Sequence, residues 1–463
     1  MIKSVTFAAV LLIGINALAQ QFDKDTILYS GNSEKHINLV ILSDGYTSGE
    51  LSKFVIDATT FTTAFFNKIP YYNYKKYFNV FIIKVPSNES GASHPGTATD
   101  VTEPVIPVIT VDNYFGSTFD YAGIHRLLVA TKTAVISTVL ANNFPNYDQV
   151  LILVNSPYYG GSGGYYTVAS THSSSAEVAI HELGHSFSGL NDEYWAGDTY
   201  ASEGINMTKQ TNPSLVKWKN WMNVNGIGIY QHCCGGNSVL WYKPHQNCLM
   251  QYLGTPFCSV CVQGTIERIH TLVTPVESYD PPNNAITGDI YPVKFKLKLI
   301  APEPNTLKRT WVLNGLIFKR NIDSVLINAS SFITGTNILN VTVEDTTQLL
   351  RVDNHASIHI SSVTWSILKT ITGIKKITSS SSEINIDLYP NPASEYINIK
   401  LLGVTKGKVK LEIYDMQGKK QKVCSLHSDE VNYINLDNLD QGIYLARIYI
   451  DNNLITSRKI IRN

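Results

Sequence analysis

The sequence has no net charge and no long block of charge of either sign. Lysine plus arginine number 37, and aspartate plus glutamate also number 37, so the formal charge at pH 7 is zero. Proteins that bind nucleic acids or anionic membranes need a basic patch, because attraction to phosphates supplies much of their affinity. The balance of charge therefore gives no support for either kind of partner.

The sequence also lacks a long apolar run. No stretch reaches the ~18 consecutive apolar residues of a membrane-spanning helix, so we expect no transmembrane anchor. Residues 1–19 have Lys3 near the start, an apolar stretch from Val5 to Ile15, and a small-residue site at Ala17 and Ala19. This pattern predicts a secretory signal peptide, and therefore an exported, soluble mature protein.

Cysteine is scarce, and its few positions are clustered. In an exported protein such clustering predicts disulfides, here local bridges around residue 250, although the pairing is not readable from the sequence. Alternatively, the C-x-x-C at 258–261 together with a cysteine at 233 or 234 predicts an additional structural metal site. The cysteines are Cys233, Cys234, Cys248, Cys258, Cys261 and, far downstream, Cys424.

Apolar residues make up 44% of the chain and aromatic residues 10%, which is enough for more than one hydrophobic core. From residue 36 onward, short β-rich runs alternate with helical patterns. The pattern predicts an α+β fold, in which helices pack on a twisted mixed sheet. The expected strands are 37–42, 78–85 and 148–155, and the expected helices are 50–67 and 118–140.

One helical stretch carries a metal-binding pattern. Ser174 and Glu177 have the spacing of a capping box, and the helix is expected to end near Gly189. His181 and His185 lie four positions apart, so both imidazoles face the same side of the helix and can bind one Zn²⁺ ion. Glu182 is then the predicted general base, which takes a proton from a zinc-bound water as it attacks a carbonyl.

A catalytic zinc needs a third protein ligand and an open fourth position. The acids that follow Gly189 are the candidates. Asp192 is the first choice, because it keeps the glycine-to-ligand spacing of the metzincin arrangement, and Glu193 is the alternative. The same acids are also compatible with polar residues at a helix end or with a Ca²⁺ site.

The segment Cys248-Leu249-Met250-Gln251-Tyr252 resembles the methionine turn of metzincins. We expect Met250 to form a polarizable floor beneath the histidines. The Tyr252 hydroxyl is expected to donate to the oxyanion that develops during hydrolysis. The alternative for Met250 is an ordinary core position.

Four strings together resemble the IgA-peptidase family of zinc metallopeptidases, over residues 36–275. The resemblance implies a metzincin-like catalytic domain within 20–275, with His181, His185 and an acid of the 192–194 stretch as ligands and Glu182 as base. The function that we predict is a secreted zinc endopeptidase of extracellular proteins or peptides. The resemblance does not carry the substrate, and immunoglobulins and other host glycoproteins are candidates only. The strings are NLVILSDGYT (38–47), FGSTFDYAGIHRLL (115–128), HELGHSFSGLNDEY (181–194) and CLMQYLGTPFCSVC (248–261).

Two further stretches, 160–164 and 276–286, contain several glycines or prolines and interrupt the pattern of strands and helices. The glycine-rich loop 160–164 either leads to an edge strand, to which an extended substrate can add by backbone hydrogen bonds, or is a simple turn between strands. Residues 276–286 are expected to be a linker. Beyond it, alternating runs over 287–370 predict an immunoglobulin-like β-sandwich, in which His355 and His359 are expected on the surface.

The serine tract 379–382 predicts a second linker, and residues 384–463 a second β-rich module. This module resembles the C-terminal sorting domains of the type IX secretion system, through LYPNP at 388–392, the turn Asp415–Gly418 and the string 442–444. The resemblance implies the secretion machinery of a Gram-negative bacterium as a partner, and a location at the cell surface or in the medium. A second adhesive sandwich is the alternative.

Two classes of function follow from these patterns. The first is a secreted zinc endopeptidase. The second is a catalytically inactive surface binding or adhesion protein that retains the peptidase fold. Glu182 favours the first, because a pure binding protein needs no general base beside two metal-facing histidines.

Overall fold

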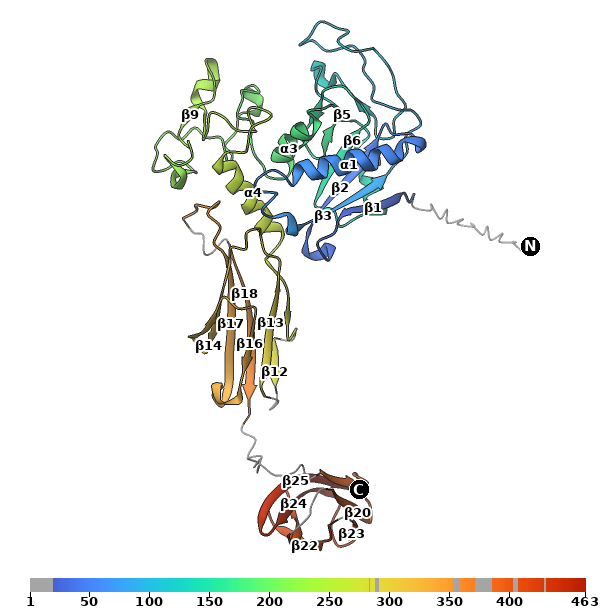
Figure 1. Cartoon of the computed structure of the whole chain (residues 1–463), viewed down its shortest axis with the longest axis vertical. Helices are drawn as coiled ribbons and strands as arrows, with labels where there is room; N and C mark the ends of the chain where they lie inside the picture. The colour runs from blue at the N-terminus through green and yellow to red at the C-terminus, as the bar shows by residue number, and fades with distance from the viewer. Residues whose placement is uncertain are drawn as a thin grey trace, which may run out of the picture. The chain divides into compact units, whose positions relative to one another are not determined.

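A computed structural model describes residues 20–282, 284–287, 291–353, 359–370, 385–402, 407–428 and 430–463 (Figure 1). The predicted signal peptide, the serine tract 379–382 and His355 lie outside these residues. The chain divides into two compact units, Met1–Thr370 and Ile371–Asn463, which are described separately.

The first unit is built on a six-stranded sheet within its described residues. The four inner strands are parallel, and an antiparallel strand lies at each edge. Inner parallel strands are covered on both faces, and accordingly every residue of β2 is buried. In sheet order the strands are β1 (Asp23–Leu28), β3 (Phe78–Lys84), β2 (Ile37–Asp44), β6 (Gln149–Val154), β8 (Thr167–Ala169) and β7 (Gly161–Ser162).

Helices cover both faces of this sheet. Alternate residues of β2 point to opposite faces, so Leu39 and Val40 belong to different cores. Helices α1 (Leu51–Phe65) and α3 (Ser175–Ser186) pack in the first core, and α2 (Thr133–Asn143) packs in the second. The α+β class and the predicted elements 37–42, 50–67, 78–85 and 148–155 are therefore confirmed to within two residues at each end.

The helix predicted over 118–140 is wrong in its first half. Only Thr133–Asn143 is helical, and the preceding residues form β4 (Ser117–Thr118), a 3-10 turn and β5 (Val129–Ala130). Asp120 and Ala122 have φ of 60° and 53°, which a right-handed helix excludes. The buried Asp120 carboxylate instead accepts a hydrogen bond from Thr97 N at 2.8 Å, so a tertiary contact overrides the local pattern.

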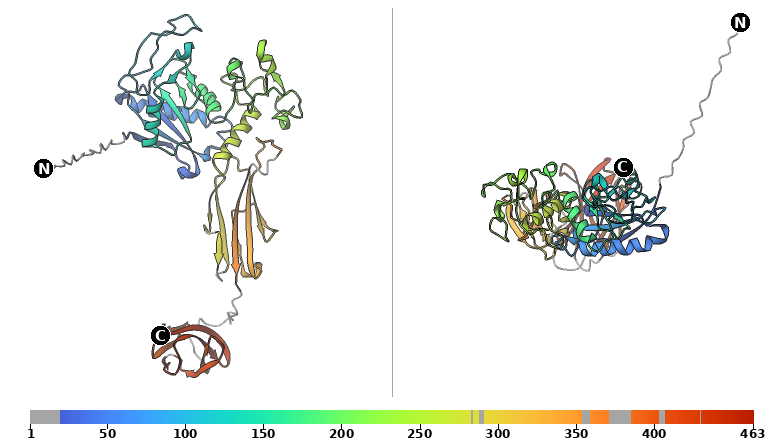
Figure 2. Two further views of the ribbon diagram at one scale, coloured as in Figure 1. Left: turned by 180° about the vertical axis from the view of Figure 1, so that it is seen from behind. Right: turned by 90° about the horizontal axis from the view of Figure 1, so that it is seen from above.

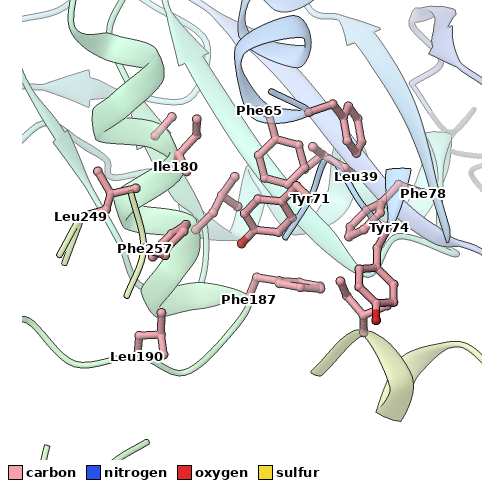
Figure 3. Close-up of a cluster of buried hydrophobic side chains, with 14 of the residues drawn as sticks. Leu39, Phe65, Tyr71, Tyr74, Phe78, Ile180, Phe187, Leu190, Leu249 and Phe257 are labelled. Carbon is pink, nitrogen blue, oxygen red and sulfur yellow. The ribbon is translucent and has the colours of Figure 1, made fainter. Parts of the chain in front are cut away.

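An aromatic cluster fixes the C-terminal end of α3 against the sheet (Figure 3). The rings of Phe65 and Tyr71 are 4.0 Å apart, and those of Phe78 and Phe187 are 5.9 Å apart. Phe187 directly follows α3, and burial of such a ring stabilises a fold by about 1.5–3 kcal/mol. The helix that carries the histidines therefore has a rigid anchor one residue beyond its last turn.

Between α3 and α4 (Ser259–Leu272) the chain has little regular structure, with a small pairing of β9 (Tyr230–Gln231) and β10 (Tyr242–Lys243). This irregular segment is held by buried tryptophans. Trp218 Nε1 donates to Gly228 O at 2.8 Å, and Trp221 Nε1 donates to Gln263 Oε1 of α4 at 2.6 Å. The views in Figure 2 show the segment lying beside the sheet domain above α4.

A β-sandwich completes the first unit. Its core contains Trp311 and Trp365, whose rings stack 5.9 Å apart with an interplanar angle of 9°. Strands β11 and β12 occupy most of the stretch expected to be a linker, because Val276 is buried and Tyr279 packs on the sandwich core. One sheet contains β11 (Val276–Asp280), β13 (Val293–Leu299) and β16 (Ser324–Ile327), and the other contains β12 (Ala285–Thr287), β18 (Ile360–Lys369), β17 (Gly335–Asp345), β14 (Leu307–Leu313) and β15 (Leu316–Arg320).

The sandwich contributes a buried carboxylate that forms hydrogen bonds with residues of the sheet domain and of α4. Asp345 is fully buried, and its Oδ2 lies 2.6 Å from the Tyr74 hydroxyl and 3.0 Å from His270 Nε2 of α4. Thr306 Oγ1 donates to Asp345 Oδ1 at 2.6 Å. His359, expected on the surface, is buried with its ring 5.3 Å from that of His270, so that expectation is wrong.

The second unit is a separate pair of sheets with its own apolar core. One sheet contains β19 (Asn385–Tyr389), β20 (Tyr396–Leu402) and β23 (Val431–Asn435). The other contains β22 (Lys420–Leu426), β21 (Val409–Asp415), β24 (Gly442–Ile450) and β25 (Asn453–Arg462). Across both units, no helix of the described residues has the length and apolarity needed to cross a membrane.

Candidate active site

Helix α3 begins without the predicted capping box. Ser174 is the N-cap residue, but its side chain makes no capping hydrogen bond. Glu177 pairs instead with Lys68 Nζ at 2.7 Å and accepts from Gly254 N at 3.3 Å. The helix ends at Ser186, and the chain reverses at Gly189 with φ of 68°. Tertiary partners of Glu177 therefore replace the local cap, while the end near Gly189 is as predicted.

His181, His185 and Asp192 converge on one point. His181 Nε2 and His185 Nε2 lie 3.2 Å apart. Asp192 Oδ1 lies 3.1 Å from the first nitrogen and 3.2 Å from the second. The two rings stand at 84° to each other. The fold thus brings together two residues one helical turn apart and an acid from beyond the reversal.

The other nitrogen of each ring faces a backbone carbonyl. His181 Nδ1 lies 3.0 Å from Leu249 O, and His185 Nδ1 lies 2.7 Å from Leu190 O. A carbonyl only accepts hydrogen bonds, so each Nδ1 carries a proton. In the neutral rings both Nε2 lone pairs then point toward each other and toward the Asp192 carboxylate. This is the orientation that outer partners impose on metal-bound histidines.

The backbone on both sides of Asp192 is fixed by hydrogen bonds. Asn191 N donates to Asn206 Oδ1 at 2.8 Å, and Glu193 N donates to Met250 O at 2.7 Å. His232 Nε2 lies 2.9 Å from Asp192 O. Burial opposes ionisation of Asp192, but its interactions with His181 and His185 outweigh this effect and hold the pKa of Asp192 below its usual range. The carboxylate is therefore ionised and held in place.

Glu193, the alternative third ligand, does not lie with the histidines. Its Oε1 is 3.1 Å from Asn206 Nδ2 and 3.3 Å from Cys261 Sγ. Asp192 therefore lines the cleft, whereas the side chain of Glu193 is buried in the interior.

Glu182 lies in the cleft beside the histidines. Desolvation by burial raises its pKa, although the nearby His181 and His185 lower it. Its Oε2 is 2.7 Å from the position that a Cβ on Gly163 would occupy. The backbone of the glycine-rich loop therefore closes against the carboxylate in a way that a side chain at 163 would prevent.

The methionine segment divides into a buried and an exposed part. Met250 is fully buried, and its Sδ lies 2.7 Å from the position of a Cβ on Gly184, between the two histidines. Met250 therefore packs directly against α3. Tyr252 is 51% exposed, and the cleft is lined by its neighbours Gln251 and Leu253 instead. The structure does not bring Tyr252 to the histidines.

His181, Glu182, His185 and Asp192 line a cleft of about 1030 Å³. Further lining residues come from the segments 121–129, 159–163, 194–201 and 249–253, together with His232. The outer side of β7 is not an open edge at Gly161, because Gly161 N donates to Arg126 O at 3.2 Å. Backbone pairing of a substrate at that residue would have to displace this contact.

Comparison with protein families decides what this region is. Residues 26–227 match the family described as IgA Peptidase M64, and the match contains His181, Glu182, His185 and Asp192. Residues 26–227 form an IgA peptidase M64 domain. The chain therefore carries a peptidase-family domain, as the resemblance of its sequence strings predicted.

The second unit matches a different family. Residues 387–463 match the Secretion system C-terminal sorting domain. A sorting domain of the type IX system implies interaction with that secretion machinery, and export of the M64 domain to the cell surface or the medium.

Individual proteins give weaker comparisons. No curated protein matches the chain. Among solved structures, dimeric latent PorU from Porphyromonas gingivalis is 15% identical with a TM-score of 0.16, over 40% of this chain and 20% of PorU. The CbhA fibronectin(III)-like modules of Clostridium thermocellum are 10% identical with a TM-score of 0.15, over 40% of this chain and 92% of theirs.

The M64 domain also places two residues in the cleft that were not singled out from the sequence. The ring of Tyr194 lies parallel to that of His181, with centroids 6.3 Å apart, and the Arg126 guanidinium lies 5.9 Å from the Tyr194 ring. Desolvation and the charge of Asp192 raise the pKa of Tyr194 to about 12, so its hydroxyl stays protonated at neutral pH. Tyr194 directly follows Asp192 and Glu193 in the sequence, and this position is the feature from which its place in the cleft could have been predicted.

The cysteines near Met250 are not bridged, which corrects the expected local disulfides. The disulfide of the described residues joins Cys233 to Cys234. Cys248, Cys258 and Cys261 are free and buried. The alternative metal site that used Cys233 or Cys234 therefore has no thiol available at either position.

Proposed function

We propose that the M64 domain is a zinc-dependent endopeptidase with His181, His185 and Asp192 as metal ligands and Glu182 as general base. The observation that carries the proposal is the convergence of two imidazole nitrogens and one carboxylate oxygen within 3.2 Å of one another. Three acceptors in this arrangement repel one another unless a cation or extra protons lie between them. Two histidines and a carboxylate are ligands that suit zinc.

The remaining chemistry follows from the side chains around the ligands. A bound zinc ion would supply Lewis acidity, which polarises a peptide carbonyl and acidifies water. Glu182, whose pKa is raised by burial, accepts the proton of the attacking water and returns it to the leaving nitrogen. Met250 and Gly184 hold the helix in close contact behind the ligands. This architecture supports a metzincin-like assignment.

We assign stabilisation of the developing oxyanion to Tyr194 and Arg126 in place of Tyr252. Both line the cleft together with Glu182, whereas Tyr252 does not. A protonated phenol and a guanidinium both donate hydrogen bonds, and such donors stabilise the transition state of acyl transfer. Tyr194→Phe is expected to lower kcat with a smaller change in KM. Tyr252→Phe is expected to leave both kcat and KM near the parent values.

The substrate class proposed is an extended segment of an extracellular protein or peptide. The sorting domain implies export, which places the cleft outside the cell. The cleft has a volume of about 1030 Å³ and is lined by aromatic side chains such as Tyr121, Tyr159 and Trp195. Immunoglobulins and other host glycoproteins remain candidates, and cleavage of a peptide library by the full chain would rank them against other sequences.

The deciding experiment changes Glu182 to Gln and follows zinc content and hydrolysis of a generic protein substrate. The variant is expected to keep the parent's zinc and to lose at least about 100-fold in kcat, which is the low end for loss of a general base. Hydrolysis at the parent rate would refute the mechanism. Inactivity of the parent itself, with zinc bound, would favour the non-catalytic binding protein instead.

A further inference from the structure

Behind the cleft, four metal-ligating side chains meet in the interior. Cys248 Sγ lies 3.7 Å from Cys261 Sγ. Glu193 Oε1 lies 3.3 Å from Cys261 Sγ and 3.8 Å from Cys258 Sγ. One ligand atom from each residue lies within 4.8 Å of every other. Glu193, Cys248 and Cys261 are fully buried, and Cys258 is 6% exposed.

We propose that Cys248, Cys258, Cys261 and Glu193 bind a second divalent metal ion of the zinc class, in a closed structural site. Sulfur and carboxylate donors in a set of four are suited to tetrahedral zinc. The site provides all four ligands from protein and leaves no open position, so its role is to hold the fold and not to activate water.

Three of the six distances between the four ligand atoms agree with a tetrahedron around one ion. Zinc–sulfur bonds of about 2.3 Å give a sulfur–sulfur edge of about 3.8 Å, and a zinc–oxygen bond of about 2.0 Å gives a sulfur–oxygen edge of about 3.5 Å. The measured edges are 3.7 Å for Cys248 to Cys261, and 3.3 and 3.8 Å for Glu193 to Cys261 and Cys258. The sulfur–sulfur edge is far longer than a disulfide bond of about 2.05 Å.

Glu193 supplies an independent reason for a cation. Its Oε2 is buried and has no hydrogen-bond partner among the described residues. A buried polar atom that is left without a partner costs about 1–3 kcal/mol. The nearby Lys243 Nζ donates to the backbone oxygen of Glu193 at 2.7 Å and to Gln251 Oε1, and not to the carboxylate. A metal ion bound by the three cysteines would provide this oxygen with a partner.

The backbone around the cluster offers partners for metal-bound sulfur. Cys258 is the N-cap residue of α4, and Cys261 lies in the first turn of that helix. The unpaired N–H groups at a helix N-terminus favour negative charge nearby, and a metal-bound thiolate carries such charge. Cys258 N donates to Cys248 Sγ at 3.3 Å, as backbone amides do around metal-bound sulfur.

The second ion would connect the two turns that orient the catalytic ligands. Glu193 directly follows Asp192 in the sequence. Cys248 directly precedes Leu249, whose carbonyl lies 3.0 Å from His181 Nδ1. The site is proposed from its own ligands, and it does not depend on the activity assigned to the cleft.

Cobalt substitution of the full-length protein tests the proposal without any mutation. Thiolate ligands give Co²⁺ an intense near-ultraviolet charge-transfer band, which histidine and carboxylate ligands do not. We expect this band in the cobalt-loaded parent, and we expect a thiol-specific mercurial to release the metal. Absence of the band, or a disulfide between any two of the three cysteines in the native protein, would overturn the proposal.

Variants then assign the ligands. Cys258→Ser is expected to contain one metal ion fewer per chain than the parent and to lose most of the charge-transfer band. Cys424→Ser is the matched control, since Cys424 is a free, partly exposed cysteine in the other unit. A Cys258→Ser protein with the parent's metal content and band would contradict the site. If Cys258→Ser does not fold, Glu193→Gln replaces it, with a weakened and shifted band expected.

Each of the two metal sites can be tested independently of the other. His181→Ala should lose the ion of the cleft and all hydrolysis, but keep the charge-transfer band at the parent's intensity. Loss of the band in His181→Ala would show that the thiolate signal arises from a metal in the cleft, and this too would overturn the proposal.

Discussion

At the level of single residues, the candidate site depends on hydrogen bonds that fix each histidine tautomer. Leu249 O and Leu190 O hold the Nδ1 protons of His181 and His185, which leaves both Nε2 atoms free to bind a metal. Asp192 completes the set because Gly189 reverses the chain with φ of 68°, a conformation that costs glycine least.

Asp192→Ala should remove the third ligand of the cleft. Loss of a residue that only hydrogen-bonds to a ligand lowers metal affinity by roughly 10–100-fold. Loss of the ligand itself is expected to lower the zinc affinity of the cleft by more than this, and hydrolysis is expected to disappear. Asp198→Ala is the control, because Asp198 is exposed in the same segment. Equal zinc affinity in the two variants, measured by competition with a chelator, would argue against Asp192 as a ligand.

Gly163→Ala tests the close approach of the loop to the base. The new Cβ would lie 2.7 Å from Glu182 Oε2, so the carboxylate must move. A misplaced general base should lower kcat about tenfold or more, with zinc content unchanged. In Gly49→Ala the Cβ meets nothing within 4 Å, so kcat should match the parent. A Gly163→Ala enzyme with the parent's kcat would mean that Glu182 tolerates the shift.

At the level of elements, the sandwich and the sheet domain share the Asp345 carboxylate. Burial opposes its ionisation, but hydrogen bonds from His270, Thr306 and Tyr74 lower the pKa of Asp345 to about 2. A carboxyl group whose pKa is lower in the folded state stabilises the fold above its unfolded pKa. This stabilisation, about 2 kcal/mol, is lost as pH falls from roughly 4 toward 2.

Asp345→Asn is therefore expected to destabilise the first unit at neutral pH by about 2 kcal/mol or more, since it leaves His270 and Tyr74 poorly paired. The difference from the parent should shrink as pH falls through 4 toward 2, as measured by urea unfolding at a series of pH values. Asp323→Asn, at an exposed position, should change stability by less than about 0.5 kcal/mol. A pH-independent difference would contradict the assigned role of the charge.

Local patterns predicted the elements better than they predicted their contacts. The i, i+4 spacing of His181 and His185 depends only on helix geometry, so it was readable from the sequence. Glu177 was predicted to cap its own helix, but it pairs with Lys68, more than one hundred residues away in the chain. The same holds for Glu193, whose partners Cys258 and Cys261 are set by the fold and not by spacing.

At the level of the whole molecule, all residues proposed for catalysis lie in the first compact unit. A protein ending at residue 370 should therefore retain the kcat and zinc content of the full chain. Removal of the 387–463 sorting domain should abolish export, so that activity accumulates inside the cell and not in the medium. Fractionation of cells expressing each form measures both results, and normal export of the shortened protein would contradict the role of the sorting domain.

A shorter protein ending at residue 275 should behave differently. It would retain Tyr74 and His270 but lack Asp345. Loss of this buried partner is expected to lower the melting temperature and the yield of folded protein relative to the form ending at 370. Identical melting curves for the two forms would show that the sandwich contributes nothing to the stability of the peptidase region.

The shared carboxylate also limits how such proteins can be assembled during evolution. A β-sandwich taken from elsewhere would have to present an acceptor at the same place, or else the buried Tyr74 hydroxyl and His270 Nε2 would lose their hydrogen-bond partner. The peptidase segment and its neighbouring sandwich should consequently be inherited as one piece.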